Sequence, residues 1–235
     1  MAVVAPFAGF SREALQFLAD LAVNNERTWF QPRKAEYERL LRDPLAALCS
    51  ALAERFADRK LPLQADASRS PFRIYRDVRF SADKSPYKTH VAASFPWTGE
   101  GGGVGAYFHL QPGEVFAGGG MWHPVPSQLA GWRSAVDSRP DDVRAILADP
   151  EFVRIFGQVN GDRLKRVPPG FAADHPGAEL LKLKDVTFGR HLSDADVASP
   201  GLPDLLADTF AVAVPLLALL AKLSPEAPHA AWLRG

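Results

Sequence analysis

The chain has one cysteine, no excess of charge of either sign, and no apolar run long enough to span a membrane. The single cysteine, Cys49, excludes an internal disulfide and falls among leucines at helical spacing, where a small buried side chain is expected. The 27 basic and 27 acidic side chains cancel, so the chain lacks the overall positive field of most nucleic-acid-binding domains. Any nucleic-acid binding would therefore need a local basic patch.

Export and membrane insertion are also disfavoured. The N-terminus lacks the basic start and long apolar stretch of a signal peptide. The most apolar segment, Phe210 to Leu220, is shorter than the ~20 residues that cross a bilayer and contains Pro215. We read it as a buried C-terminal helix with a kink at the proline, and we expect a cytoplasmic protein with no membrane partner.

Helical periodicity marks both ends of the chain. Residues 10–58 predict three helices, beginning with a Ser11 cap, at Pro32, and with an Asp43 cap followed by Pro44. Residues 125–222 again show helical spacing, with one late strand near Leu181 to Phe188. Ser193 and Asp196 have the spacing of a capping box, although aspartate replaces the usual glutamate. The last third is therefore expected to be helical with a single strand.

Between these regions, residues 72–122 show the two-residue alternation of strands. Aromatic and β-branched residues recur in four candidate strands, at residues 72–80, 88–97, 104–110 and 114–122. Short connections make neighbours antiparallel, and Gln111 to Glu114 has proline and glycine where a tight turn wants them. We predict one globular α+β domain over residues 1–235, with N-terminal helices, a central, largely antiparallel sheet and C-terminal helices.

Positive charge is concentrated at the start of this sheet. The segment Arg73 to His90 contains five arginine or lysine residues and two aspartates. Alternation places polar side chains of the first three strands on one face, namely Arg73, Arg79, Lys88, His90, Tyr107 and His109. Like charges on neighbouring strands repel, so we expect an anion to bind there.

Two further features of this segment support an anion site. Arg76 falls on the apolar face, where its charge needs a carboxylate, a carbonyl or a ligand as partner. A structural ion pair with an acid on a packing helix is one explanation. The connector from Ser81 to Tyr87 presents hydroxyls and Lys84 on a stiff turn, in which Ser81 or Asp83 can close the loop.

Four segments resemble blocks of an uncharacterised family, the domain of unknown function 2461. They are R-D-V-R-F-S-A-D-K-S-P-Y-K-T-H at residues 76–90, N-N-E-R-T-W-F at 24–30, Y-F-H-L-Q-P-G-E at 107–114 and A-G-G-G-M-W-H-P at 117–124. The resemblance runs from about Phe10 to the C-terminal helix. It implies a soluble single-domain protein. The family has no established activity that the resemblance could assign to this chain.

Chemistry, if present, is expected to use the histidines. His90 or His109 beside arginines is kept neutral and able to accept a proton, with Tyr87 or Tyr107 as a hydrogen-bond donor. A metal site of His90, His109 and His123 with an acid lacks a preorganising spacing, and neighbouring cations oppose it. Common hydrolase, dehydrogenase and metalloprotease motifs are absent, so the cofactor remains unidentified and enzymatic activity open.

Three functions therefore remain in view. The leading prediction is a site for a phosphate- or carboxylate-bearing small molecule, formed by Arg73, Arg76, Arg79, Ser81, Lys84, Tyr87, Lys88 and Tyr107. The second is a nucleic-acid module in which Tyr75, Tyr87 or Trp122 stacks on bases. The third is a protein-interaction scaffold or a purely structural ion network. The pattern does not determine the oligomeric state.

Overall fold

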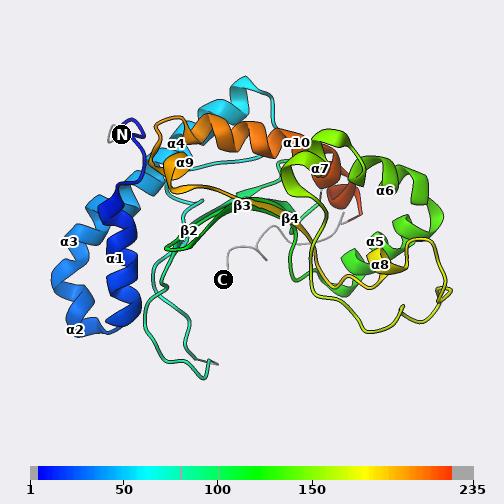
Figure 1. Cartoon of the computed structure of the whole chain (residues 1–235), viewed down its shortest axis with the longest axis horizontal. Coiled ribbons are helices and arrows are strands. Elements are labelled where there is room, and N and C mark those ends of the chain that lie inside the picture. The colour runs from blue at the N-terminus through cyan, green and yellow to red at the C-terminus, as the bar shows by residue number, and fades with distance from the viewer. Residues whose placement is uncertain (1–4, 80, 100, 224–235) are drawn as a thin grey trace.

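A computed structural model describes residues 5–79, 81–99 and 101–223 and has the predicted α+β architecture in a single domain (Figure 1). One group of helical elements comes first, then the sheet, then a second group of helices that encloses the last strand. Because local periodicity determines which segments become helices and which become strands, this order follows from the sequence.

The N-terminal helical part begins as predicted. Ser11 caps α1 (Arg12–Val23), and its hydroxyl accepts a hydrogen bond from the Ala14 N–H at 3.2 Å. The chain then passes through α2 (Arg27–Phe30), the 3₁₀ turn η1 (Gln31–Arg33), α3 (Lys34–Tyr37), the π turn η2 (Glu38–Arg42) and α4 (Asp43–Asp58).

One predicted cap in this part is wrong. Asp43 does not cap α4, since the chain enters the helix directly from the π turn and the Asp43 side chain instead bonds Arg42 at 3.0 Å. Pro44 does lie in the first turn, where its missing N–H costs nothing.

The sheet has four antiparallel strands in sequence order. They are β1 (Val91–Pro96), β2 (Gly105–Gln111), β3 (Glu114–Met121) and β4 (Val186–His191). The turn between β2 and β3 contains Gly113 at φ +79°, a conformation that glycine adopts without strain. The late strand lies a few residues beyond its predicted position and pairs with β3.

The prediction of a strand at residues 72–80 is wrong. The described part of this segment forms only isolated bridges, Pro71 with Ala93 and Tyr75 with Tyr87, and Phe80 lies outside the described residues. Pro71 and Pro86 have no N–H to donate, which interrupts a regular ladder. The described residues of 73–87, here called the hairpin, therefore form an irregular loop that projects away from the edge of the sheet (Figure 1).

The C-terminal part contains α5 (Pro126–Ser138), α6 (Pro140–Leu147), α7 (Pro150–Phe156), α8 (Ala178–Leu181), α9 (Asp194–Ala198) and α10 (Leu202–Lys222). The predicted capping box of α9 is present, with Ser193 and Asp196 bonding each other's backbone N–H groups. The predicted C-terminal helix extends further toward the N-terminus than its apolar run, and Pro215 lies inside it.

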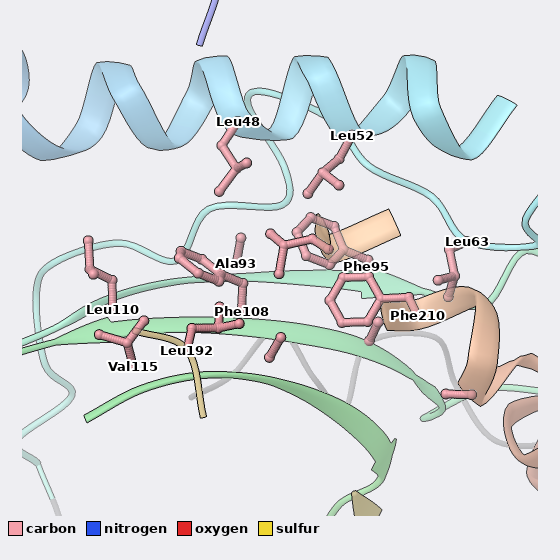
Figure 2. Packing of buried hydrophobic residues seen from close by; sticks show 14 of the residues in the cluster. Leu48, Leu52, Leu63, Ala93, Phe95, Phe108, Leu110, Val115, Leu192 and Phe210 are labelled. Atoms are coloured by element: carbon pink, nitrogen blue, oxygen red, sulfur yellow. The ribbon is translucent and has the colours of Figure 1, made fainter. Parts of the chain in front are cut away.

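The core lies between one face of the sheet and the helices α4 and α10. Leu48 and Leu52 of α4 point toward Phe95 and Phe108 of the sheet, and Phe210 of α10 packs beside them (Figure 2). Phe95 and Phe210 have ring centroids 5.8 Å apart. The alternating apolar residues of β1 and β2 thus point where the two-residue period predicts.

Among the described helices, α10 is long and apolar enough to cross a membrane on length and composition alone. A core helix of a soluble protein has the same properties, and Leu206, Phe210 and Leu217 are fully buried in this core. Ion pairs from Arg55 and Arg59 of α4 to Asp204 further join the two helices. We therefore read α10 as a core helix.

Candidate functional site

The sheet face opposite α4 and α10 carries the polar residues that the alternation predicts. The strand register aligns Ala92, His109, Phe116 and His191 in one row across the sheet, and Ser94, Tyr107, Gly118 and Gly189 in the next. Because side chains in such rows are close neighbours, Tyr107 and His109 sit together near the centre of this face.

Glycines keep the second half of this face free of side chains. A Cβ atom on Gly118 would lie 2.3 Å from the Phe188 carbonyl oxygen, and one on Gly120 would lie 2.2 Å from that of Val186. Gly118 and Gly120 must therefore be glycine, because the backbone of β4 lies too close to leave room for a side chain. Trp122, which follows this glycine run, is about half exposed.

The hairpin is fixed to the N-terminal helices by one asparagine. The Asn25 side chain donates to the Tyr87 carbonyl at 2.9 Å and accepts from the Tyr87 N–H at 3.0 Å, as a neighbouring strand would. The Tyr87 ring is 1% exposed and stacks on Phe30 at 4.1 Å. The family-like block 24–30 thus holds the family-like block 76–90 in place.

Most hairpin cations already have partners within the hairpin. Arg76 pairs with Asp83, while Arg79 forms a forked pair with Asp77, with a closest approach of 2.6 Å. Lys84 donates to the Val78 carbonyl at 2.9 Å. The acid that neutralises Arg76 is therefore on the hairpin, not on a packing helix.

Aspartates also shape this loop. Asp83 accepts hydrogen bonds from the Ser85 N–H and hydroxyl, which together with Arg76 hold the pKa of Asp83 far below its usual range. The Asp77 carboxylate, bonded to the side chain and N–H of Arg79, has its pKa lowered to about 2. The predicted turn closure by Asp83 is confirmed, and Ser81 makes no side-chain hydrogen bond among the described residues.

A different group of residues forms a connected set on the sheet face. We call it the histidine cluster and define it as Phe72, Lys88, His90, Tyr107, His109 and Phe116. The His90 and His109 rings lie 4.4 Å apart, and the Tyr107 hydroxyl is 3.1 Å from His109 Nδ1. Phe116 stacks on His109 at 4.9 Å.

The same set continues toward the hairpin through Phe72 and Lys88. The Lys88 ammonium lies 5.1 Å from the Phe72 ring centre, and Phe72 in turn lies 6.1 Å from the Tyr107 ring. Phe72 and Phe116 were not predicted as site residues. Phe116 alternates with Val115 and so falls on the polar face, whereas Phe72 has the same parity as Ile74 and would be assigned to the apolar face. In the sequence alone, an aromatic side chain carries no chemistry that marks it as a site residue.

Burial controls the protonation of the histidine cluster. Desolvation, aided by the neighbouring His109 and Lys88, lowers the pKa of His90 to about 4. Desolvation also lowers the pKa of His109, although Gln111 and Glu114 act in the opposite direction. Both histidines are therefore neutral at pH 7.

One atom of this cluster is left without a partner. His109 is 8% exposed and its Nε2 atom is buried with no hydrogen bond in the described structure. Gln111 lies near enough to raise the His109 pKa in part but does not reach hydrogen-bonding geometry at Nε2. A buried polar group in this state costs roughly 1–3 kcal/mol, so Nε2 is a natural position for a ligand atom.

The remaining predicted residues are separated by the fold. Arg73 is exposed on the hairpin's first arm, and Tyr87 is buried against Phe30. Of the aromatic residues considered for base stacking, Tyr75 and Trp122 are exposed and Tyr87 is not. Within the described ranges, no group of three or more His, Cys, Asp or Glu residues is arranged to hold a metal ion.

Comparison with known proteins adds a family. Residues 13–218 match the model of a family described as a conserved hypothetical protein, DUF2461. No curated protein and no solved structure matches the chain. The match covers the hairpin, the sheet and most of α10.

Proposed function

The chain belongs to this family of conserved hypothetical proteins, DUF2461, and we propose that it binds a small phosphate- or carboxylate-bearing molecule at the histidine cluster. The observation that carries the proposal is His109. Its ring is hydrogen-bonded to the Tyr107 hydroxyl, stacks on Phe116, contacts the tilted His90 ring, and is buried with Nε2 unpaired.

The hydrogen-bonding groups of the cluster favour an anion. Burial raises the pKa of Tyr107 to about 12, so its hydroxyl keeps its proton and can donate to His109 Nδ1. The imidazole proton then lies on Nε2, which becomes a donor without an acceptor. An anion supplies acceptor oxygens, and nothing in this arrangement requires a ligand donor.

Lys88 provides the positive charge beside these donors. It is half-buried, and desolvation together with Arg73 lowers its pKa. A bound phosphate or carboxylate would stabilise the ammonium form and reverse this shift.

The same site is suited to proton transfer. A histidine that is neutral at pH 7 can accept a proton from a bound substrate. We assign any acid–base step to His90, whose ring lies 4.4 Å from that of His109, because His109 already accepts from Tyr107 at Nδ1 and carries its proton on Nε2. Tyr87 is not proposed as a proton donor to the ligand, because its ring is buried and its hydroxyl accepts a hydrogen bond from the Gln31 side chain at 3.4 Å.

The hairpin cations receive a different assignment. Arg76, Arg79 and Lys84 were candidate charge clamps, but their partners Asp83, Asp77 and the Val78 carbonyl favour a structural ion network. We therefore propose that they hold the hairpin's shape. The nucleic-acid and protein-scaffold alternatives become outcomes of the ligand test.

The test is a thermal-shift screen of the full chain against sugar phosphates, nucleotides, dicarboxylates and oligonucleotides. A ligand at 100 times its dissociation constant adds ~2.7 kcal/mol, which raises Tm by roughly 5–10 °C for a domain of this size. Lys88→Gln and Tyr107→Phe should lose most of this shift. Arg79→Gln, which removes an equal charge from the hairpin, should retain it.

Three results would redirect the proposal. Equal shifts in wild type, Lys88→Gln and Tyr107→Phe would exclude the histidine cluster. A shift lost only in Arg79→Gln would return the site to the hairpin cations. A response to oligonucleotides alone, falling steeply with salt, would favour the nucleic-acid alternative.

We also propose a cytoplasmic location. Cys49 is fully buried, and burial raises the pKa of its thiol far above the usual range, so the thiol is inert and unavailable for a disulfide. Fractionation of cells expressing the tagged chain tests this proposal, and recovery in the membrane fraction would contradict it.

A further inference from the structure

We propose a second ligand site, specific for a flat aromatic molecule that carries one anionic group, in a groove between the N-terminal helices and residues 67–75. The groove has a volume of about 430 Å³ and lies against α3 and η2 on one side and the first arm of the hairpin on the other. Ligand sites in proteins commonly measure ~300–1,000 Å³, so the groove can hold a small two-ring compound.

Buried apolar side chains form its floor. Phe30, Tyr37 and Ile74 line the groove and are 1%, 7% and 5% exposed. The Phe30 and Tyr37 rings are 5.4 Å apart and tilted by 53°, which makes an aromatic base on which another ring can pack. Tyr75, 44% exposed, also lines the groove and offers an aromatic edge to a bound molecule.

Positive charge surrounds this floor. The lining includes Lys34, Arg42 and Arg73 and a single carboxylate, Glu38, which Arg42 already binds at 2.6 Å. The side chains of Lys34 and Arg73 make no salt bridge or hydrogen bond among the described residues. Lys34 and Arg73 are exposed cations beside the apolar floor, and Arg73 interacts electrostatically with Asp77. The two cations are complementary to an aromatic anion and unfavourable to a cationic ligand.

A hydroxyl group adds a directional contact. Burial raises the pKa of Tyr37 to about 12 despite the opposing charge of Arg42, so the phenol remains a donor at neutral pH. No hydrogen bond joins its hydroxyl to another residue in the described parts of the chain, and solvent reaches this oxygen, since it is not one of the buried unpaired atoms. A ligand oxygen in the groove would replace water as its acceptor.

The groove and the histidine cluster are separate sites. Phe72 is the one member of the histidine cluster that lines the groove. The neighbouring residue Arg73 belongs to the groove, whereas Lys88, His90, Tyr107 and His109 do not line it. Each proposal can therefore fail without the other.

Isothermal titration with 1-naphthyl phosphate tests the groove, with inorganic phosphate and 1-naphthol as the two halves of the probe. We expect naphthyl phosphate to bind at least about tenfold more tightly than either half, because the ring and the anion are recognised together. The double variant Lys34→Gln, Arg73→Gln should weaken this binding by about tenfold or more.

Matched controls separate the groove from general effects. Arg39→Gln removes a cation from the same helical run outside the groove and should leave the dissociation constant within about twofold. Ala46→Trp fills the groove without a change of charge and should abolish binding. Ala35→Trp adds the same ring at an exposed position of α3 and should not. Near-ultraviolet circular dichroism establishes that each variant is folded.

Three outcomes would overturn the inference. The first is naphthyl phosphate binding that is unchanged in both the double variant and Ala46→Trp. The second is binding that is lost in Lys88→Gln and retained in the double variant, which would assign the probe to the histidine cluster. The third is equal affinity for naphthyl phosphate and inorganic phosphate, which would remove the aromatic specificity.

Discussion

The hairpin and the histidine cluster are neighbours with opposite ways of handling polar groups. The hairpin holds most of the local charge, but Arg76, Arg79 and Lys84 find partners a few residues away within the hairpin. The histidine cluster holds one lysine, two neutral histidines and a buried nitrogen with no partner. The density of formal charge therefore does not indicate which polar groups of this molecule lack a hydrogen-bond partner.

The physical reason is burial. Ion pairs between exposed side chains contribute little and cost little to rearrange, so a charged loop can neutralise itself without specialised surroundings. A buried imidazole cannot recruit solvent and depends on the groups that the fold places beside it. The two regions should consequently respond very differently to substitution.

The largest effect is expected at the glycines of the sheet face. Gly120 has φ +120°, and a Cβ there would lie 2.2 Å from the Val186 carbonyl oxygen. Gly120→Ala should destabilise the fold by more than about 3 kcal/mol because it combines backbone strain with a clash against β4. Urea unfolding monitored by circular dichroism measures the loss.

Gly113→Ala is the matched control. Gly113 also has positive φ, +79°, but nothing lies within 4 Å of its Cβ position. We expect about 1–2 kcal/mol from backbone conformation alone. Equal losses in the two variants would show that steric contact with β4 does not matter.

The next effect concerns the attachment of the hairpin. Asn25→Ala removes two hydrogen bonds to the Tyr87 backbone and leaves its N–H and carbonyl groups unpaired. The free energy of unfolding should fall by about 2–3 kcal/mol. Asn24→Ala removes one exposed bond to the Asp20 carbonyl and should cost under about 1 kcal/mol.

Hydrogen exchange extends this test to the hairpin itself. If Asn25 fixes the hairpin, the amides of Arg76 and Lys88, which bond across it, should exchange faster in Asn25→Ala. Unchanged protection would mean that stacking of Tyr87 on Phe30 is sufficient to hold it.

The smallest effect is a dependence of stability on pH. Because the His90 pKa is depressed to about 4 in the folded state, from about 6.5 when unfolded, the unfolded chain binds more protons between these values. Stability is therefore complete above pH 6.5 and falls as the pH is lowered toward 4. After allowance for solvent screening, we expect roughly 1–2 kcal/mol of loss by pH 5.

His90→Gln should flatten this part of the stability curve. Urea midpoints between pH 4.5 and 7.5 measure the difference, with exposed His191→Gln as the control. A wild-type slope that persists in His90→Gln would mean that His90 does not titrate as its burial implies.

The order and type of the main elements could be predicted, because they depend on local periodicity. Ser11 and Ser193 as caps, the β2–β3 turn and the inward set of Phe95 and Phe108 all follow from residues close in sequence. The polar face of β2, with Tyr107 and His109, follows from the same alternation. The strand at 72–80 was wrong because the flanking residues Pro71 and Pro86 and the available partners, not the alternation, decide whether a ladder forms.

The sequence predicted which residues form the site better than it predicted how they are arranged. His90, His109, Tyr107 and Lys88 were identified from their types and positions, and they lie together. Asn25 was not identified as an anchor, because a polar residue at a helix end is adequately explained by the helix. Its partner, Tyr87, is 62 residues away, and local reasoning does not reach that far.

The sequence by itself determined the family, the balance of charge and the succession of helices, strands and helices, since each is encoded in composition or in short-range spacing. The tertiary structure alone decided which cations are neutralised, which imidazole nitrogen is left unpaired, and that Lys34 and Arg73 border one apolar groove. Hydrogen bonding and desolvation act between groups that meet only after folding, so they cannot be read from spacing along the chain.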